Sequence, residues 1–206
     1  MKVRFSGFVA ALASIGLATS AGAAPAKSCN LAPDPKGDVV ATQASEATVT
    51  PDPALDLVMG DVGTDKTTVT GLVRLDKLSR PAATSPAGAV YEVRLLTATG
   101  ELPYTLWAHL TGATATYGVG TVKDATAAEL FDSTGTATGV VDLAKNEIRI
   151  SAPLSALGSP KQGSKLSFAE IVVKRSAGNQ FYGRYADSGS GKSYKVGSPT
   201  CVPVGK

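Results

Sequence analysis

The stretch "AVYEVRLLTATGELPYTLWAHL" (89–110) decides the fold, because apolar and polar residues alternate along both of its halves. In the first half, Tyr91 and Val93 alternate with Glu92 and Arg94. Successive side chains of an extended chain point to opposite faces, so this pattern is typical of a strand with one buried face. The first half therefore predicts a β-strand whose apolar side packs in a core.

The second half, "YTLWAHL" (104–110), alternates in the same way, and the turn-forming sequence "TATGE" (97–101) stands between the halves. A hairpin that aligns the two apolar faces also aligns the two polar faces. The shared polar face would then hold four candidate binding residues: Glu92, Arg94, Trp107 and His109.

Outside this hairpin, short stretches rich in Val, Thr, Ile, Leu and Tyr are separated by Gly, Pro, Asp and Ser. This succession of short strand-forming stretches and turn-forming residues predicts an all-β sandwich or barrel. A helical period is faint at 123–132, and "APLSALGSP" (152–160) predicts a loop with a single helical turn. The predicted strands are 55–62, 67–75, 89–97, 102–110, 114–122, 136–143, 146–152, 165–174, 179–186 and 193–197.

The N-terminal residues have the pattern of a secretory signal peptide. Lys2 and Arg4 precede the apolar run 8–18, and small residues follow it. The run is shorter than the roughly 20 residues that span a bilayer. We expect a signal peptide at 1–24, cleaved near Ala23 or Ala24, and a secreted chain without a membrane anchor.

The remaining residues, 25–206, are enough for a single β-sandwich domain. Without Lys2 and Arg4 the chain has 18 basic and 17 acidic residues, which excludes the strongly basic surface of a nucleic-acid binder. Its two cysteines, Cys29 and Cys201, stand near the two ends. In an oxidising compartment such an even pair predicts a structural disulfide.

The residues that catalysis usually needs are scarce. The sequence has one histidine, two cysteines expected to be bridged and no G-x-S-x-G motif, which argues against a zinc site and a serine hydrolase. Paired carboxylates are the remaining enzymatic option, but the pattern of the 17 acidic residues singles out no pair. We therefore expect no enzymatic activity, with a small secreted hydrolase as the weakest alternative.

Two similar acidic phrases, "PDPKGDVV" (33–40) and "PDPALDLV" (51–58), stand near the start of the mature chain. Each is explained by a proline-stiffened turn that leads into a strand. The alternative is calcium binding, because calcium takes six to eight oxygen ligands, several of them carboxylate. The ligands would be Asp34 and Asp38, with Asp52 or Asp56 brought alongside.

The segments "DPKGD" (34–38) and "ALDLVMGDVGTDKTTVTGLVRLDKL" (54–78) resemble the opening of secreted bacterial DOMON-like and carbohydrate-binding-module-like β-sandwiches. These include modules appended to glucodextranase-type glycosidases and to secreted peptidases. The resemblance implies a jelly-roll-like sandwich of two antiparallel sheets, here with about nine or ten strands. It also implies ligand or surface binding in place of catalysis, and a structural calcium ion at Asp34, Asp38 and Asp56.

Sugar binding needs flat aromatic faces beside hydrogen-bonding groups. Trp107 on the polar face of the hairpin meets this requirement, and Tyr182 with Arg184 would extend the surface. The alternative is that Trp107 only covers the core. The sequence thus favours a secreted binding protein for carbohydrate or cell-envelope material, with a structural or protein-interaction module as the alternative. The predicted ligand-binding residues are Glu92, Arg94, Trp107, His109 and Tyr182.

Overall fold

The computed structural model is an all-β sandwich of two antiparallel sheets. It describes residues 25–37, 53–79, 88–98, 103–122, 131–177, 180–187 and 191–205. The expected signal peptide, Asp38 and Asp52 lie outside these ranges, as does most of the predicted turn at 97–101. Within the described residues, no helix has the length and the apolar character that crossing a membrane requires.

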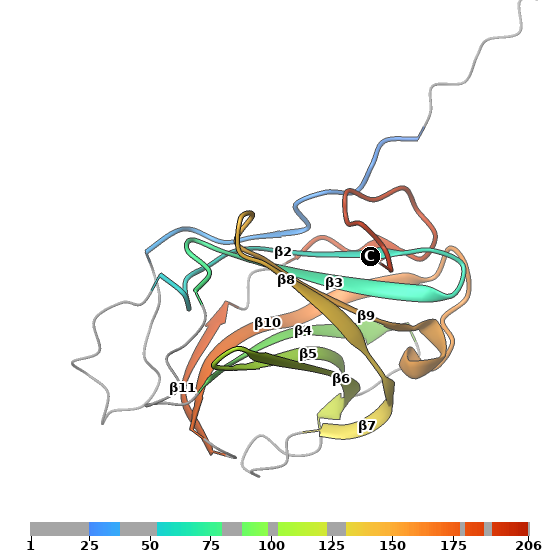
Figure 1. The fold of residues 1–206 in the computed structure, drawn as a ribbon. Coiled ribbons are helices and arrows are strands. Elements are labelled where there is room, and N and C mark those ends of the chain that lie inside the picture. Colours follow the sequence, from blue (N-terminus) through green and yellow to red (C-terminus); the bar gives the residue numbers. More distant parts are fainter. Residues whose placement is uncertain are drawn as a thin grey trace, which may run out of the picture.

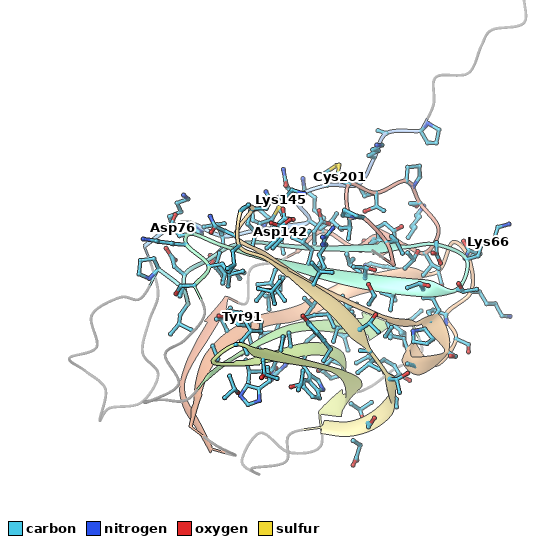
Figure 2. The ribbon with its side chains drawn as sticks, viewed as in Figure 1. Lys66, Asp76, Tyr91, Asp142, Lys145 and Cys201 are labelled. Atoms are coloured by element: carbon cyan, nitrogen blue, oxygen red, sulfur yellow. A yellow bond between two sulfur atoms is a disulfide. The ribbon has the colours of Figure 1, made fainter. Side chains whose placement is uncertain are left out.

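The short sheet has five strands. Its spatial order is β1 (Ala32–Pro33), β2 (Leu57–Thr64), β3 (Thr68–Leu75), β9 (Glu147–Pro153) and β8 (Thr138–Asp142). The turn between β2 and β3 is fixed by Asp65, whose carboxylate accepts hydrogen bonds from the amides of Thr67 and Thr68. These backbone bonds lower the pKa of Asp65. At the turn between β8 and β9, Asp142 and Lys145 form an ion pair (Figure 2).

The long sheet has seven strands. Six follow the order β11 (Gln180–Asp187), β10 (Lys165–Ala177), β4 (Gly88–Thr97), β5 (Tyr104–Thr111), β6 (Thr114–Val122) and β7 (Phe131–Thr136), and β12 (Tyr194–Lys195) pairs with the end of β10. The sheet curls strongly, and its outer side, turned away from the short sheet, is concave (Figure 1). We call this outer side the concave face.

Each of the ten predicted strands corresponds to a strand of the structure, from β2 to β6 and from β8 to β12. The 3-10 helix η2 (Leu154–Leu157) confirms the helical turn expected at 152–160. Sequence reasoning missed the two-residue strand β1 and all of β7 except its last residue, Thr136. The helical interpretation of 123–132 is wrong at its end, because residues 131 and 132 pair with β6 as a strand.

The core lies between the sheets. Tyr91, Val93 and Leu95 of β4 are completely buried there, as their alternation predicted. Tyr91 points into the sandwich, where its hydroxyl donates a hydrogen bond to the carbonyl of Ala54 (Figure 2). The sheets approach closely at Gly71, where an added Cβ would lie 3.1 Å from side-chain atoms of the opposite sheet.

The predicted disulfide between Cys29 and Cys201 is present and joins residues 172 positions apart. Beside it, the amide of Ser28 donates to the carbonyl of Pro199 (2.8 Å) and the amide of Cys201 donates to the carbonyl of Ser28 (3.1 Å). The C-terminal segment continues across the outer side of the short sheet (Figures 1 and 2). Its Gly205 amide donates to the hydroxyl of Thr70.

Candidate functional site

The pairing of β4 with β5 brings the predicted binding residues onto the concave face. Glu92 is directly opposite Trp107, and Val90 is opposite His109. Directly opposed side chains in an antiparallel pair lie about 4.5–5.5 Å apart at their Cβ atoms. Four of the five predicted residues, Glu92, Arg94, Trp107 and His109, therefore form one continuous surface.

Arg94 is the centre of an ion network on this face. Its Nε and Nη2 donate to the same Glu92 oxygen at 2.9 and 2.6 Å, and its Nη1 donates to Glu170 at 2.6 Å. The Glu92 side chain is 0% exposed, while those of Arg94 and Glu170 are 13% and 15% exposed. The network is thus almost completely removed from water.

Sequence reasoning expected Glu92 and Arg94 on a solvated surface and did not single out Glu170. The reason is a β-bulge in β10: Phe168 pairs with Leu95 and Glu170 with Arg94, which leaves residue 169 as an extra residue. Strict alternation from Leu166 and Phe168 would direct residue 170 into the core. The bulge turns Glu170 to the concave face, and alternation alone gives no sign of it.

A buried network of this kind is not explained by folding stability. Removing charges from water is expensive, and apolar residues of similar size usually stabilise a fold equally well. Buried ion networks occur both as structural features and at functional sites. The Glu92–Arg94–Glu170 network, hereafter the ion network, therefore marks this face as a candidate site.

Trp107 lies beside the ion network and is partly exposed. It pairs with Gly118 of β6, and a Cβ added there would fall 2.6 Å from the indole nitrogen and closer still to Cε2 and Cζ2. If the added Cβ lay in the plane of the indole, beside the Cε2–Cζ2 bond, the nitrogen would be the nearest of these three atoms. Since the nitrogen is the farthest of the three atoms, the indole covers Gly118 with its face.

Two more polar groups complete this face. Burial lowers the pKa of His109, the single histidine, and its Nε2 lies 3.2 Å from the hydroxyl of Thr111. Thr105, opposite Arg94, is fully buried. Its hydroxyl has no hydrogen-bond partner among the residues that the structure describes. Both groups are uncharged hydrogen-bonding groups at neutral pH.

Tyr182, the fifth predicted residue, lies in β11 with its backbone opposite Arg175. Its side chain is outside the described part of the structure, so its place in the site stays a prediction. Gly118 was not predicted as a site residue. Glycine inside a strand often marks a close approach, and "YGVG" (117–120) within the predicted strand carries that signal twice.

The two acidic phrases meet at one corner of the short sheet. The amide of Gly37 donates to Asp56 Oδ2 (2.9 Å), and the amide of Asp34 donates to the carbonyl of Val58 (3.1 Å). Nearby, Lys36 Nζ lies 2.6 Å from Asp76 Oδ1. The carboxylate of Asp76, and more weakly that of Asp56, raises the Lys36 pKa. Hydrogen bonds between the two acidic segments thus hold their backbone turns in place.

Calcium at this corner is only partly supported by the described residues. Asp56 is buried, and its Oδ1 accepts no hydrogen bond from any residue in the described ranges, which suits a cation. No group of three His, Cys, Asp or Glu residues able to hold a metal ion occurs among those residues, and Asp38 is not one of them. Asp34 and Asp56 alone fall short of a calcium shell. The calcium site stays a prediction.

The outer side of the short sheet carries a second polar cluster. Arg74 donates to Glu147, and Asp61 accepts hydrogen bonds from the amides of Asn30 and Val62, each at 2.9 Å. Burial raises the pKa of Asp61. The C-terminal segment covers part of this side, where Val202 packs with Met59 and Leu72. Folding explains these contacts without a ligand.

The chain was compared with known proteins in three ways. No family model matches the sequence, no curated protein matches it, and no solved structure matches it. The resemblance to DOMON-like and carbohydrate-binding-module-like sandwiches therefore stays a prediction. What is established is the all-β sandwich and the disulfide.

Proposed function

We propose that this chain is a secreted, non-catalytic protein that binds an extracellular ligand on its concave face. Carbohydrate or cell-envelope material is the ligand class that the face fits best. The observation that carries the proposal is the position of Trp107, which is partly exposed directly opposite the desolvated carboxylate of Glu92.

The chemistry of sugars matches this arrangement. A pyranose ring presents an apolar face of C–H groups and an edge of hydroxyls, so it is held by an aromatic surface next to fixed hydrogen-bonding groups. Arg94 keeps its guanidinium rigid by binding two carboxylates, and rigid partners lose little entropy when a ligand binds. A disulfide between distant positions supports the extracellular location.

The ion network also supports binding over hydrolysis. A glycosidase of the two-carboxylate type needs one carboxyl group protonated as the general acid. Here both carboxylates accept hydrogen bonds from one guanidinium, so neither is free to act as that acid without breaking the ion network. We therefore place the hydrolase last among the alternatives.

The interaction-module alternative has one specific observation in its favour. The short sheet ends at β8 in the described structure, and Val140 and Leu143 at this edge are 37% and 48% exposed. Edge strands with exposed apolar residues are templates for pairing with another chain. This alternative predicts a complex that survives Trp107→Ala and is weakened by Leu143→Asp, read by analytical ultracentrifugation.

The test of carbohydrate binding is retention of the purified mature protein on insoluble cellulose, chitin and peptidoglycan. We expect at least one of these to retain the wild type. Trp107→Ala is expected to abolish retention while the protein stays folded at the assay temperature, since the ring is partly exposed; its melting temperature is measured alongside. Leu143→Ala, an exposed apolar residue of the other sheet, is the matched control. Equal retention of wild type and Trp107→Ala would refute the proposal.

A further inference from the structure

We propose that Gly118 is a positioning residue that makes Trp107 a flat stacking platform, so that a ligand ring lies parallel to the long sheet over β5 and β6. This inference rests on the proposed binding function. It assigns a role to a residue without a side chain, and it fixes the orientation of the ligand relative to the sheet.

The first step is the cross-strand pair. Trp107 and Gly118 are directly opposed in the register of β5 and β6. Any side chain at 118 would occupy the space that the indole now fills, because the added Cβ would fall within 2.6 Å of three ring atoms. With alanine or a larger residue there, Trp107 would have to stand away from the sheet.

The second step is the direction of the ring. Since the indole covers Gly118 with its face, one π-face is used against the backbone of β6, and the opposite face points away from the sheet. Trp107 is partly exposed, and we assign that exposure to this outer face. A ring stacked on it would lie parallel to the sheet, in the offset geometry that aromatic surfaces favour.

The third step is the edge of the ligand. The ion network begins at Glu92, which is opposite Trp107 on the side away from Gly118, because β5 lies between β4 and β6. A ligand ring over the indole would therefore have its polar edge toward Glu92 and Arg94. The class of ligand that fits is a ring with one apolar face and equatorial polar groups, as in β-1,4-linked glucose or N-acetylglucosamine chains.

Glycine beside an aromatic residue has a second, purely structural explanation. An aromatic side chain that covers a glycine in a neighbouring strand stabilises the sheet. That explanation predicts a loss of stability for Gly118→Ala and no change in the affinity of the folded protein. The two explanations are separated by binding and fluorescence measurements.

The experiment titrates the mature protein with cellohexaose and chitohexaose and follows the fluorescence of Trp107, the single tryptophan of the chain. For whichever oligosaccharide binds the wild type, we expect Gly118→Ala to weaken binding about five- to tenfold. We also expect its unliganded emission to shift to longer wavelength, because the displaced ring is more exposed. Gly135→Ala in β7, where the added Cβ would lie 3.0 Å from Ala156, is the control for a glycine substitution away from the indole.

A double-mutant cycle tests whether Gly118 acts through Trp107. In the Trp107→Ala background, where binding is measured by isothermal titration calorimetry because the tryptophan is absent, Gly118→Ala is expected to cause no further loss of affinity. If the wild type binds and Gly118→Ala binds with the same affinity, this inference is overturned and the proposed function stays intact. Failure of the wild type to bind either oligosaccharide or any of the three insoluble polymers would overturn both.

Discussion

The sharpest energetic prediction concerns Arg94, because its guanidinium is the only described positive group that contacts Glu92 and Glu170. Arg94→Met keeps a long apolar stem and removes the charge and three hydrogen bonds. Glu92 is 0% exposed, so its carboxylate would lose the Arg94 guanidinium and gain little contact with water in exchange. Breaking a buried ion pair in this way costs about 3–5 kcal/mol of unfolding free energy.

The size of the loss is bounded by two related variants. Glu92→Gln combined with Arg94→Met removes the stranded charge, so this double variant is expected to recover at least about 2 kcal/mol of the loss. Arg74→Met is the matched control on the short sheet, where Arg74 is partly exposed beside Glu147. Water replaces its guanidinium more readily, and we expect a smaller loss of about 1–2 kcal/mol.

The assay is urea unfolding followed by the fluorescence of Trp107, with the free energy taken from the linear dependence on urea. The reasoning requires a large loss in Arg94→Met and a clear recovery in the double variant. A loss below about 1 kcal/mol, or a double variant as unstable as the single one, would show that the network is solvated and energetically unimportant.

Three further predictions concern the rest of the sandwich. Replacing Cys29 and Cys201 with serine should lower the unfolding free energy by about 4–5 kcal/mol, because the closed loop is long; a urea midpoint unchanged by the replacement would contradict this. Burial raises the Asp61 pKa above 3.8, so the folded state binds the proton of this carboxyl group more tightly than the unfolded state does. The stability that this proton contributes is lost as the pH rises through the folded pKa. Asp61→Asn should therefore gain stability relative to wild type as the pH rises from below 3.8 through the folded pKa, and parallel curves would exclude this role. Asp56→Ala should cost about 1–2 kcal/mol in EGTA, because the Gly37 amide loses its acceptor. Any rise in wild-type melting temperature with millimolar calcium should be absent from this variant, and an equal rise in both would exclude Asp56 as a ligand.

Strand positions were predictable from the sequence where local alternation and tertiary packing agree. In β4 and β5 the apolar residues alternate regularly, and the structure buries them as expected. β7 was missed because "ELFD" (129–132) has helix-forming residues, and the pairing of 131 and 132 with β6 overrides that preference. Two-residue strands such as β1 carry too few residues to show a period.

The candidate site was predictable only in part, for a different physical reason. The register of one hairpin sufficed to group Trp107 with Glu92. Glu170 depends on a bulge, and Gly118 matters because it lacks a side chain, so neither contributes to a pattern of apolar and polar residues. Burial of Glu92 depends on its tertiary neighbours, which the alternation within one strand does not specify.

The outer sides of the two sheets differ in a way that favours the concave face for the proposed binding. On the short sheet, the chain itself satisfies the polar groups: Ser151 bonds Thr70, and the C-terminal segment lies across the strands and is held by the disulfide. On the long sheet, charged groups are desolvated next to a tryptophan that is still partly exposed. Folding accounts for the first surface, because every group named there contacts another part of the chain. Folding stability alone gives no reason to keep charges at 92, 94 and 170, where apolar residues would serve equally well, and the proposed ligand at Trp107 would supply that reason.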